Sequence, residues 1–257
     1  LIVLFFLPTL EVFYLGQILP MMLLGVLGFL YFINRRKDFF AGLMFNLVLI
    51  KPQLLYLLVV AVVIWALQNR RWKVLAGLLI GFLAESLLVT SLNPGIFQDY
   101  LVYTTESMPL MITISISQFL RHQFGINKTW LQYCLVPPAI IWIFAYYIYH
   151  NHDWQWQRNI PWVILVSLAT TPFVWFSDLH FAVFAILPIA AWVVERRRIW
   201  LKAFFLTTVI IVPVIPFIYS TYWYEYWWLS LFFLIWYALW RMTAHRLPVL
   251  ETQEGLA

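Results

Sequence analysis

The sequence predicts an all-α, polytopic bundle of transmembrane helices, and two observations support this fold class. Of the 257 residues, 64% are hydrophobic and 11% are charged, whereas an ordinary soluble domain carries about 25% charged residues. The apolar segments are also long and non-alternating. Lipid tolerates only helices or closed barrels, because every backbone N–H and C=O needs an internal partner. We therefore expect a single transmembrane domain over residues 1–257.

Clusters of basic residues define the expected topology. They are Arg35-Arg36-Lys37, Arg70-Arg71-Lys73 and Arg196-Arg197-Arg198, and short basic loops stay in the cytoplasm. The formal charge of +5 is explained by these loops and does not indicate nucleic-acid binding. The single cysteine, Cys134, cannot form an intrachain disulfide, and the ligands of a structural zinc site are missing, so no metal site is expected.

The first two elements follow from these clusters, because a full span needs about 20 apolar residues. Residues 12–33 are expected to run inward. The next apolar segment lies between two basic clusters and is too short for two full spans. We expect half-length helices over residues 39–50 and 54–67, with Lys51-Pro52-Gln53 at the turn, since proline disfavours helix in the residue before it. A single Pro-kinked helix is the alternative.

The remaining segments continue the same alternation across the membrane. The second short hairpin among them has Ser177-Asp178 near its tip, and the outer loop is expected to hold an interfacial helix near residues 109–120. We expect an outward span over residues 74–92, an outer loop over 93–128 and an inward span over 130–149. The two halves of the second hairpin follow over residues 160–176 and 179–194. An outward span over residues 199–219, an inward span over 227–240 and a cytoplasmic tail over 247–257 complete the chain.

The start of the chain carries its own expectation. Residues 1–7 are apolar, and no basic segment precedes them, so they do not have the pattern of a signal peptide. They resemble the end of an earlier membrane segment. We expect the chain to be the C-terminal part of a longer protein.

Lys51 is the strongest candidate for a functional residue, because ionisable groups at membrane depth are costly. Beside Pro52 and Gln53, its ammonium group is suited to hold a phosphate by charge-assisted hydrogen bonds. Two structural interpretations remain open. Lys51 could reach toward an interface along its aliphatic stem, or it could pair with Glu85, which lies in the middle of the expected span over residues 74–92.

Three other polar residues interrupt apolar segments. Asp178 and His180 lie at the tip of the second hairpin, where they could orient an acceptor hydroxyl or act as a general base. A tip solvated by water is the alternative. Gln17 opens an apolar helix after Gly16, and such a polar residue can also serve only to join helices in the membrane.

The order of several short motifs resembles the integral-membrane glycosyltransferases of the GT-C superfamily. The resemblance is strongest to the polyprenol-phosphate-mannose-dependent α-1,2-mannosyltransferase group and covers roughly residues 8–195. The motifs, which are separated by two basic loops and a long outer loop, are Gly16-Gln17, Ala41-Gly42-Leu43, Lys51-Pro52-Gln53 and Thr171-Pro172 followed by Trp175 and Asp178.

This resemblance implies an active site on the outer face of the cytoplasmic membrane of a bacterium. The donor would be a polyprenyl-phosphate sugar, the acceptor a lipid or glycan, and the displacement inverting, with no cofactor. Lys51 would neutralise the leaving phosphate, where preorganised charge helps most. Gln17 and Gln53 would shape the lipid-phosphate pocket, and Asp178 and His180 would lie near the acceptor.

The chain departs from the family pattern in two places. Some members carry a Trp followed by a His pair, and here Ser177-Asp178 and a displaced His180 stand in its place. The catalytic carboxylate of the family lies upstream of the Gly-Gln helix, so we expect the base before Leu1. Within this chain, Asp178 and Glu11 are the candidates.

Two other classes of function remain open on the sequence. A secondary transporter would use two Pro-interrupted hairpins as internal repeats, although residues 39–67 and 160–194 share no similarity. It would need a polar path from both sides of the membrane. A non-catalytic membrane subunit would tolerate alanine at Lys51 and Asp178.

Overall fold

The computed structural model describes residues 2–107, 111–196, 198–219 and 223–246, and this part of the chain contains helices and no strands. The expected cytoplasmic tail, residues 247–257, lies outside the described residues. The α-helices are α1 (Ile2–Phe5), α2 (Leu7–Tyr14), α3 (Leu19–Asn34), α4 (Asp38–Phe45), α5 (Tyr56–Gln68), α6 (Trp72–Leu92), α7 (Ile96–Val102), α8 (Ile116–Phe124), α9 (Val136–His150), α10 (Trp156–Thr170), α11 (Val183–Val194), α12 (Ile199–Ile211), α13 (Ile215–Tyr219) and α14 (Trp228–Arg246).

Short 3₁₀ or π turns join or extend these helices. They are η1 (Asn46–Ile50), η2 (Tyr103–Ser107), η4 (Thr129–Gln132), η5 (Asn151–Asp153), η6 (Ser177–Ala182), η7 (Val212–Val214) and η8 (Trp223–Tyr226). Four helical segments of the described chain are long and apolar enough to cross a membrane, and a fifth is added if α2 and α3 count as one broken span. The four are Trp72–Leu92, Thr129–Asp153, Ser177–Val194 and Ile199–Ile218.

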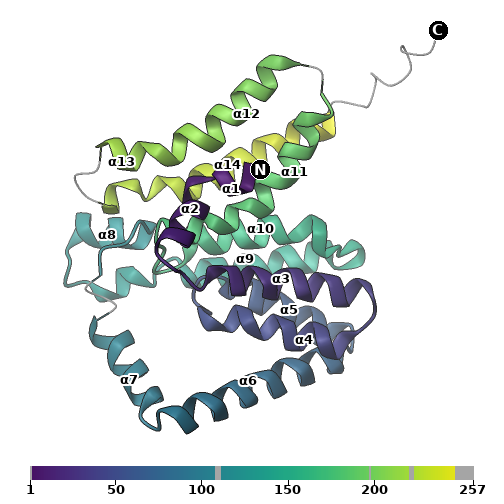
Figure 1. The fold of residues 1–257 in the computed structure, drawn as a ribbon, viewed down its shortest axis with the longest axis vertical. Helices are drawn as coiled ribbons and strands as arrows, with labels where there is room; N and C mark the ends of the chain where they lie inside the picture. The colour runs from purple at the N-terminus through teal and green to yellow at the C-terminus, as the bar shows by residue number, and fades with distance from the viewer. Residues whose placement is uncertain (1, 108–110, 197, 220–222, 247–257) are drawn as a thin grey trace.

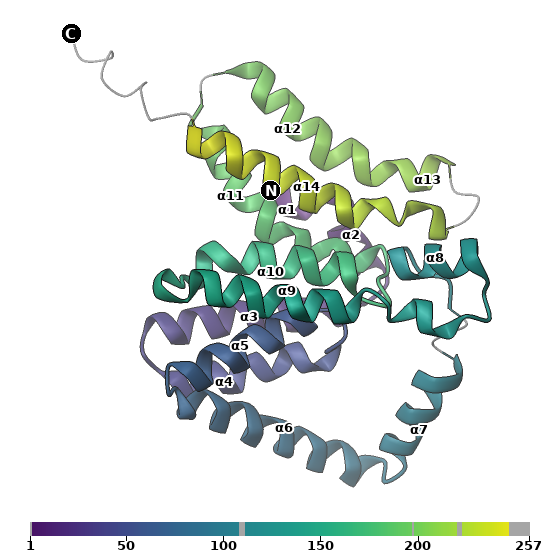
Figure 2. The ribbon, with the colours of Figure 1, turned by 180° about the vertical axis from the view of Figure 1, so that it is seen from behind.

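The loops that carry the basic clusters lie on one side of the molecule. The α3–α4 and α5–α6 connections, the end of α11 and the start of α12 are on the right in Figure 1 and on the left in Figure 2. We call this side the basic end. Helices α7, α8 and α13 lie on the opposite side. The two ends of the bundle therefore differ in charge, which is the asymmetry that orients a membrane protein.

The first expected span, residues 12–33, is wrong as a continuous helix. The chain breaks between α2 and α3, whose axes differ by 119°. Gly16 has a φ of 60°, a conformation that glycine adopts without steric cost. Pro20 follows in the first turn of α3, where the missing N–H has no helical partner to lose. Gln17 consequently lies at the corner between two helices.

The hairpin of α4, η1 and α5 is interrupted at residues 51–55, between Ile50 and Tyr56. Breaking a helix at membrane depth leaves carbonyl groups that lipid cannot satisfy. Two hydroxyls of the α10 region supply the missing donors. Ser167 Oγ donates to the Leu54 carbonyl at 3.0 Å, and Thr171 Oγ1 donates to the Gln53 carbonyl at 2.8 Å. The interruption is therefore stabilised by a segment more than 100 residues away in sequence.

The second hairpin is also interrupted, and α10 ends earlier than expected. Residues 160–176 were predicted as one helical half, but α10 stops at Thr170, before Pro172, and η6 begins at Ser177. Two side chains, one before α8 and one in η4, bind this interruption: Ser115 Oγ donates to the Pro172 carbonyl at 2.8 Å, and the Gln132 side chain donates to the same oxygen. The helix expected near residues 109–120 is α8, at Ile116–Phe124.

Glycine allows α4 to approach α6 closely. A Cβ atom on Gly42 would overlap the Val74 carbonyl, and a Cβ atom on Gly77 would overlap the Phe39 carbonyl. Small residues at such crossings are typical of membrane helices, which gain little from hydrophobic burial in lipid. Leu79, on another face of α6, stays exposed as expected for a lipid-facing surface.

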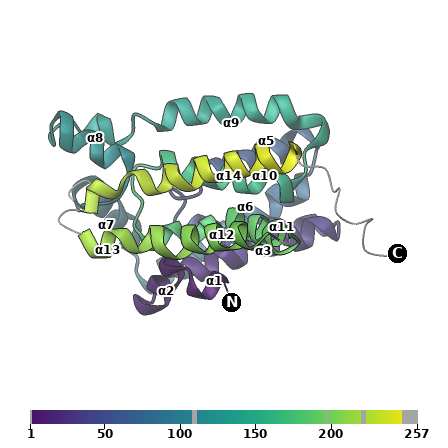
Figure 3. The same ribbon diagram turned by 90° about the horizontal axis from the view of Figure 1, so that it is seen from above.

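Helix α10 lies at the centre of the bundle. It packs against α5, α9, α11 and α14, and its buried side chains include Ile160, Val163, Ile164 and Leu168. Figure 3 shows α10 and α14 between α9 at one edge and α2 at the other. This central position brings the end of α10 and the interruption after it next to both α2 and the first hairpin.

Candidate active site

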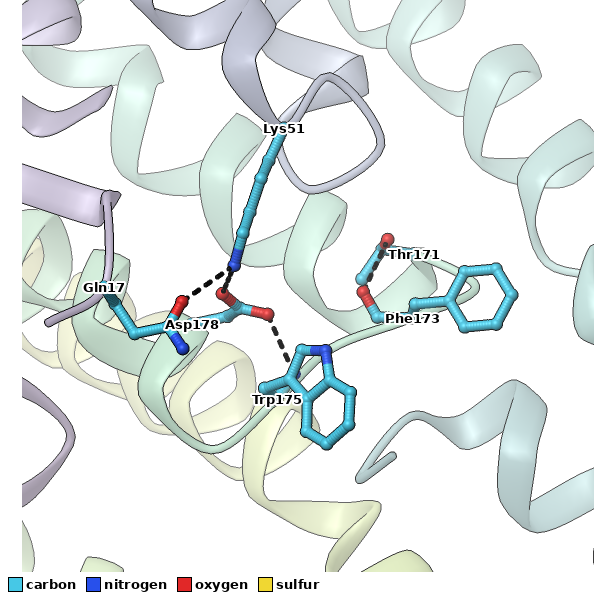
Figure 4. Close-up of polar contacts among 6 residues, drawn as sticks. All are labelled: Gln17, Lys51, Thr171, Phe173, Trp175 and Asp178. Atoms are coloured by element: carbon cyan, nitrogen blue, oxygen red, sulfur yellow. Dashed lines mark hydrogen bonds and ion pairs between the residues drawn. The ribbon is translucent and has the colours of Figure 1, made fainter. Parts of the chain in front are cut away.

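Three of the predicted site residues meet at one point (Figure 4). Lys51 follows η1, Gln17 lies at the α2–α3 corner, and Asp178 lies in η6. The Lys51 Nζ donates to Gln17 Oε1 at 3.3 Å and to Asp178 Oδ1 at 3.4 Å. One ammonium group thus joins Gln17, which is 34 residues before Lys51, to Asp178, which is 127 residues after it.

Asp178 is the buried member of this group. Its side chain is 3% exposed, and its Oδ2 accepts the Trp175 backbone N–H at 2.8 Å. The alternative of a hairpin tip solvated by water is therefore wrong for this residue. Both carboxylate oxygens are engaged, one by the ammonium group and one by the backbone. The carboxylate thereby fixes both the Lys51 side chain and the turn that contains Trp175.

Lys51 retains donor capacity toward the open side of the site. An ammonium group has three N–H donors, and the described residues provide acceptors for two of them. The Lys51 side chain is 24% exposed, and it lines a cavity. A negatively charged group in that cavity can accept the third hydrogen bond without displacing Asp178.

The cavity beside Lys51, which we call the Lys51 cavity, has a volume of about 520 Å³. Its polar wall comes from the α2–α3 corner and the two interruptions, and its aromatic wall comes from α7, η2 and residues 171–176. The lining residues are Leu15, Gln17, Ile50, Lys51, Gln53, Leu54, Tyr100, Tyr103, Met111, Phe173, Trp175 and Asp178. The structure therefore brings Gln53 to the same cavity as Gln17, Lys51 and Asp178.

A smaller cavity of about 250 Å³, which we call the Glu11 cavity, adjoins the first. Leu15, Gln17 and Trp175 line both cavities. Glu11 lines the smaller one, and its Oε2 atom is buried with no hydrogen-bond partner among the described residues. Glu11 thus differs from Asp178, because its carboxylate is not fully occupied by the protein.

His180 lies away from both cavities. It is 3% exposed, and its Nδ1 shares a hydrogen bond of 2.8 Å with Thr9 Oγ1 on α2. Neither cavity includes it among its lining residues. The expectation that His180 contacts an acceptor is not supported by this geometry. Its position instead joins η6 to α2.

Glu85 is not the partner of Lys51, which corrects one of the structural interpretations. Glu85 is exposed on α6, and it forms no ion pair with any described residue. Lys51 pairs with Asp178 instead. The sequence could not distinguish these carboxylates, since both interrupt apolar segments.

Sequence reasoning missed the hydroxyls that support the site. Ser167 and Thr171 donate to the broken hairpin, and Tyr56 and Thr170 share a hydrogen bond of 2.7 Å between their hydroxyl oxygens. The available signal was the occurrence of three hydroxyl residues within five positions of an apolar helix, just before Pro172. Hydroxyls at that place are suited to satisfy carbonyls on a neighbouring interrupted segment.

Comparison with known proteins gives a family match. The model of Glycosyltransferase family 87 matches residues 1–172, which include Glu11, Gln17, Lys51 and Gln53, and Asp178 lies beyond the matched range. A search of curated proteins found no match, and a search of solved structures found none. The matched range is more than half of the 257 residues. This apolar helical chain, with its interrupted hairpins around a lysine, therefore belongs to glycosyltransferase family 87.

Proposed function

We propose that this glycosyltransferase moves a hexose, with mannose as the first candidate, from a polyprenyl-phosphate donor to a lipid or glycan acceptor. The proposed site is the Lys51 cavity, on the outer face of the cytoplasmic membrane. The observation that supports this most is the Lys51 ammonium group, which lies on a cavity wall with an N–H donor directed to no described acceptor.

The charge of the donor fits this lysine. A sugar linked to a polyprenyl phosphate carries one negative charge, and the leaving polyprenyl phosphate gains a second as the bond to the sugar breaks. A fixed ammonium group stabilises the developing charge more than the ground state, which is the condition for catalysis. Asp178 and Gln17 hold Lys51 in position before the donor binds, so little reorganisation is needed.

The proposed step is a direct displacement. The acceptor hydroxyl oxygen forms a bond to the anomeric carbon, and the bond from that carbon to the phosphate oxygen breaks with its electron pair. Polyprenyl phosphate leaves, the anomeric configuration inverts, and a carboxylate takes the hydroxyl proton. The lipid donor carries the activated sugar, so the proposal requires no cofactor.

Glu11 is the carboxylate of this chain that best fits the role of general base. Both oxygens of Asp178 already accept hydrogen bonds, whereas the Glu11 Oε2 has no described partner and Glu11 lines the adjoining cavity. Gln17 and Trp175 line both cavities, so the donor phosphate would bind in the Lys51 cavity and the acceptor hydroxyl would enter from the adjoining Glu11 cavity. A base upstream of Leu1 is the family-based alternative.

The donor is tested with purified protein in proteoliposomes. We expect transfer of labelled mannose from a polyprenyl-phosphate donor to an extracted lipid or glycan fraction, and no transfer from a nucleotide-linked mannose. Transfer from the nucleotide sugar alone would overturn the proposed donor. A glucosyl donor in a parallel reaction tests which hexose is used.

The base is tested by Glu11→Gln, with Glu85→Gln as a matched control on the exposed face of α6. Loss of a general base typically costs about 10²- to 10⁴-fold, so we expect at least about a 100-fold loss in the first variant and no change in the second. If Glu11→Gln retains transfer while Lys51 variants lose it, the base lies elsewhere and the role of Lys51 stands.

The side of the membrane is tested by cysteine labelling. In a Cys134→Ser background, which removes the single cysteine, Tyr103→Cys places a thiol on the wall of the Lys51 cavity. We expect a membrane-impermeant maleimide to label this variant in intact cells and to leave Arg36→Cys, at the basic end, unlabelled. The reverse pattern would contradict an outer active site.

A further inference from the structure

An apolar groove lies at the basic end of the bundle, and none of its lining residues lines the Lys51 cavity or the Glu11 cavity. Helices α11, α12 and α14 enclose it, and its volume is about 300 Å³. Its walls are aromatic, with Trp192 from α11, Trp200 and Phe204 from α12, and Trp236 and Trp240 from α14. Phe205 and Trp236 stack with ring centroids 5.8 Å apart, which joins α12 to α14 within the groove.

Two arginines flank the aromatic rings of this groove. The Arg196 guanidinium lies 5.1 Å from the Trp192 ring centroid, and the Arg241 guanidinium lies 5.9 Å from the Trp240 ring centroid. Trp192 and Trp240 are themselves in edge contact, with centroids 6.4 Å apart. Stacking on the rings positions both cations beside one pair of rings that also lines the groove.

The charge of these arginines is not neutralised within the described protein. Neither Arg196 nor Arg241 pairs with a carboxylate of any described residue. An apolar groove, two of whose aromatic rings each carry a cation with no carboxylate partner, is complementary to a molecule with an apolar chain and an anionic head. Basic pockets between helices at the cytoplasmic side of a membrane bind phospholipid head groups in this way.

The length of the groove agrees with such a ligand. Its α14 wall runs from Trp236 to Thr243, which is about 10 Å at the helical rise of ~1.5 Å per residue. One leaflet contributes about 15 Å of hydrocarbon, half of the ~30 Å core. The groove can therefore hold the upper part of an acyl chain while the phosphate remains at the level of the arginines.

We propose that this groove binds one anionic phospholipid from the leaflet at the basic end, with an acyl chain against the tryptophans and the phosphate between Arg196 and Arg241. This site is separate from the Lys51 cavity and shares no lining residue with it. It does not depend on the proposed sugar transfer. Bound lipid would join α11, α12 and α14 at their ends.

The experiment uses the full chain, purified in detergent and titrated with phosphatidylglycerol or phosphatidylethanolamine while native mass spectrometry counts the bound lipids. We expect one retained phosphatidylglycerol and at least about tenfold weaker retention of phosphatidylethanolamine. Arg196→Gln combined with Arg241→Gln should lower phosphatidylglycerol retention by at least about tenfold. Each Gln keeps hydrogen-bonding capacity and removes charge, so a tenfold change reports about 1.4 kcal/mol of electrostatic attraction.

Two control variants make the result decisive. Arg35→Gln with Arg36→Gln removes the same charge at the same end, where Arg35 also stacks on a ring, Tyr31, but lines no part of the groove. We expect retention to remain unchanged. Thr243→Trp fills the groove and keeps both arginines, and we expect it to lose the lipid.

Three results would overturn the proposal. One is equal loss in the Arg35 and Arg196 double variants, which would indicate a general effect of charge. Another is full retention in Thr243→Trp, which would show that the groove is not used. The third is binding only after removal of residues 247–257, which would identify that segment as the occupant. Size-exclusion chromatography of each variant verifies that the protein is folded.

Discussion

The two interrupted hairpins, α4–η1–α5 and α10–η6–α11, are built alike but differ in the exposure of the charged side chain that each contributes. Each is interrupted beside a proline, Pro52 or Pro172, and each contributes one charge to the Lys51 cavity. The Lys51 side chain is 24% exposed, whereas that of Asp178 is 3% exposed and is also bound to the backbone. The first hairpin thus presents a charge to a ligand, and the second holds that charge in position.

The largest expected effect is the loss of transfer in Lys51→Ala. Removing preorganised charge from a reacting phosphate typically costs about 10²- to 10³-fold, so we expect at least a ~100-fold loss with an assay that uses the polyprenyl-phosphate donor. Lys51→Arg should retain part of the activity, because the charge remains and its geometry changes. Lys73→Ala, a lysine lost from the basic end, is the matched control. Unaltered turnover in Lys51→Ala would remove Lys51 from the mechanism.

The difference in exposure predicts that removing Lys51 and removing Asp178 lower the stability of the protein by different amounts. Lys51→Ala leaves a buried carboxylate without its cation, which costs on the order of 3 kcal/mol, whereas Asp178→Ala leaves an ammonium group that the cavity can hydrate. We expect a larger drop in the apparent Tm for Lys51→Ala than for Asp178→Ala. The double variant should recover most of that stability and none of the transfer. Equal drops in both single variants would contradict the assignment of Asp178 as the buried support.

The hydroxyls of the second hairpin should contribute less to the stability of the protein than the ion pair does. Thr171→Val leaves the Gln53 carbonyl without its donor, and an unsatisfied buried group costs about 1–3 kcal/mol. Thr208→Val is the control, because the Thr208 hydroxyl donates to a carbonyl within its own helix. Chemical denaturation in detergent should show the loss in the first variant only, with recovery in Thr171→Ser. A comparable loss in Thr208→Val would show that buried threonines matter in general.

The smallest expected effect on transfer is that of His180→Gln. His180 contacts Thr9 and lines neither cavity, so we expect kcat/KM to stay within about threefold, which is about 0.7 kcal/mol in the barrier. The apparent Tm should fall slightly, since the bond that joins η6 to α2 is altered. A loss as large as that of Lys51→Ala would restore the family-based expectation that this histidine acts on the acceptor.

Local chemistry predicted part of this arrangement. The interruption after Ile50 follows from Lys51-Pro52, because proline lacks a donor and restrains the residue before it. Lys51 became a candidate functional residue because an ionisable group at membrane depth is costly. Gln53 is two residues away in sequence, so both were expected at the same turn. These inferences depend only on neighbouring residues.

The ion pair with Asp178 could not be predicted in the same way. Lys51 and Asp178 are 127 residues apart, and their contact depends on α10 lying at the centre of the bundle. Glu85, only 34 positions from Lys51, is the possible partner on the sequence alone, but Glu85 is exposed on α6 in the structure. The break before α3 had a local signal, a glycine four residues before a proline, which is typical of one helix ending and another beginning.

The contact between Thr171 and the Gln53 carbonyl has a consequence for biosynthesis. The two residues are separated by 118 positions. At a translation rate of about 5–20 residues per second, the ribosome needs roughly 6–24 s to make the second after the first. During that interval the nascent hairpin has open carbonyls and no donor from α10. We therefore expect the first hairpin to remain in contact with water or with the insertion machinery until α10 emerges, so translation pauses before Ser167 should lower the yield of folded protein.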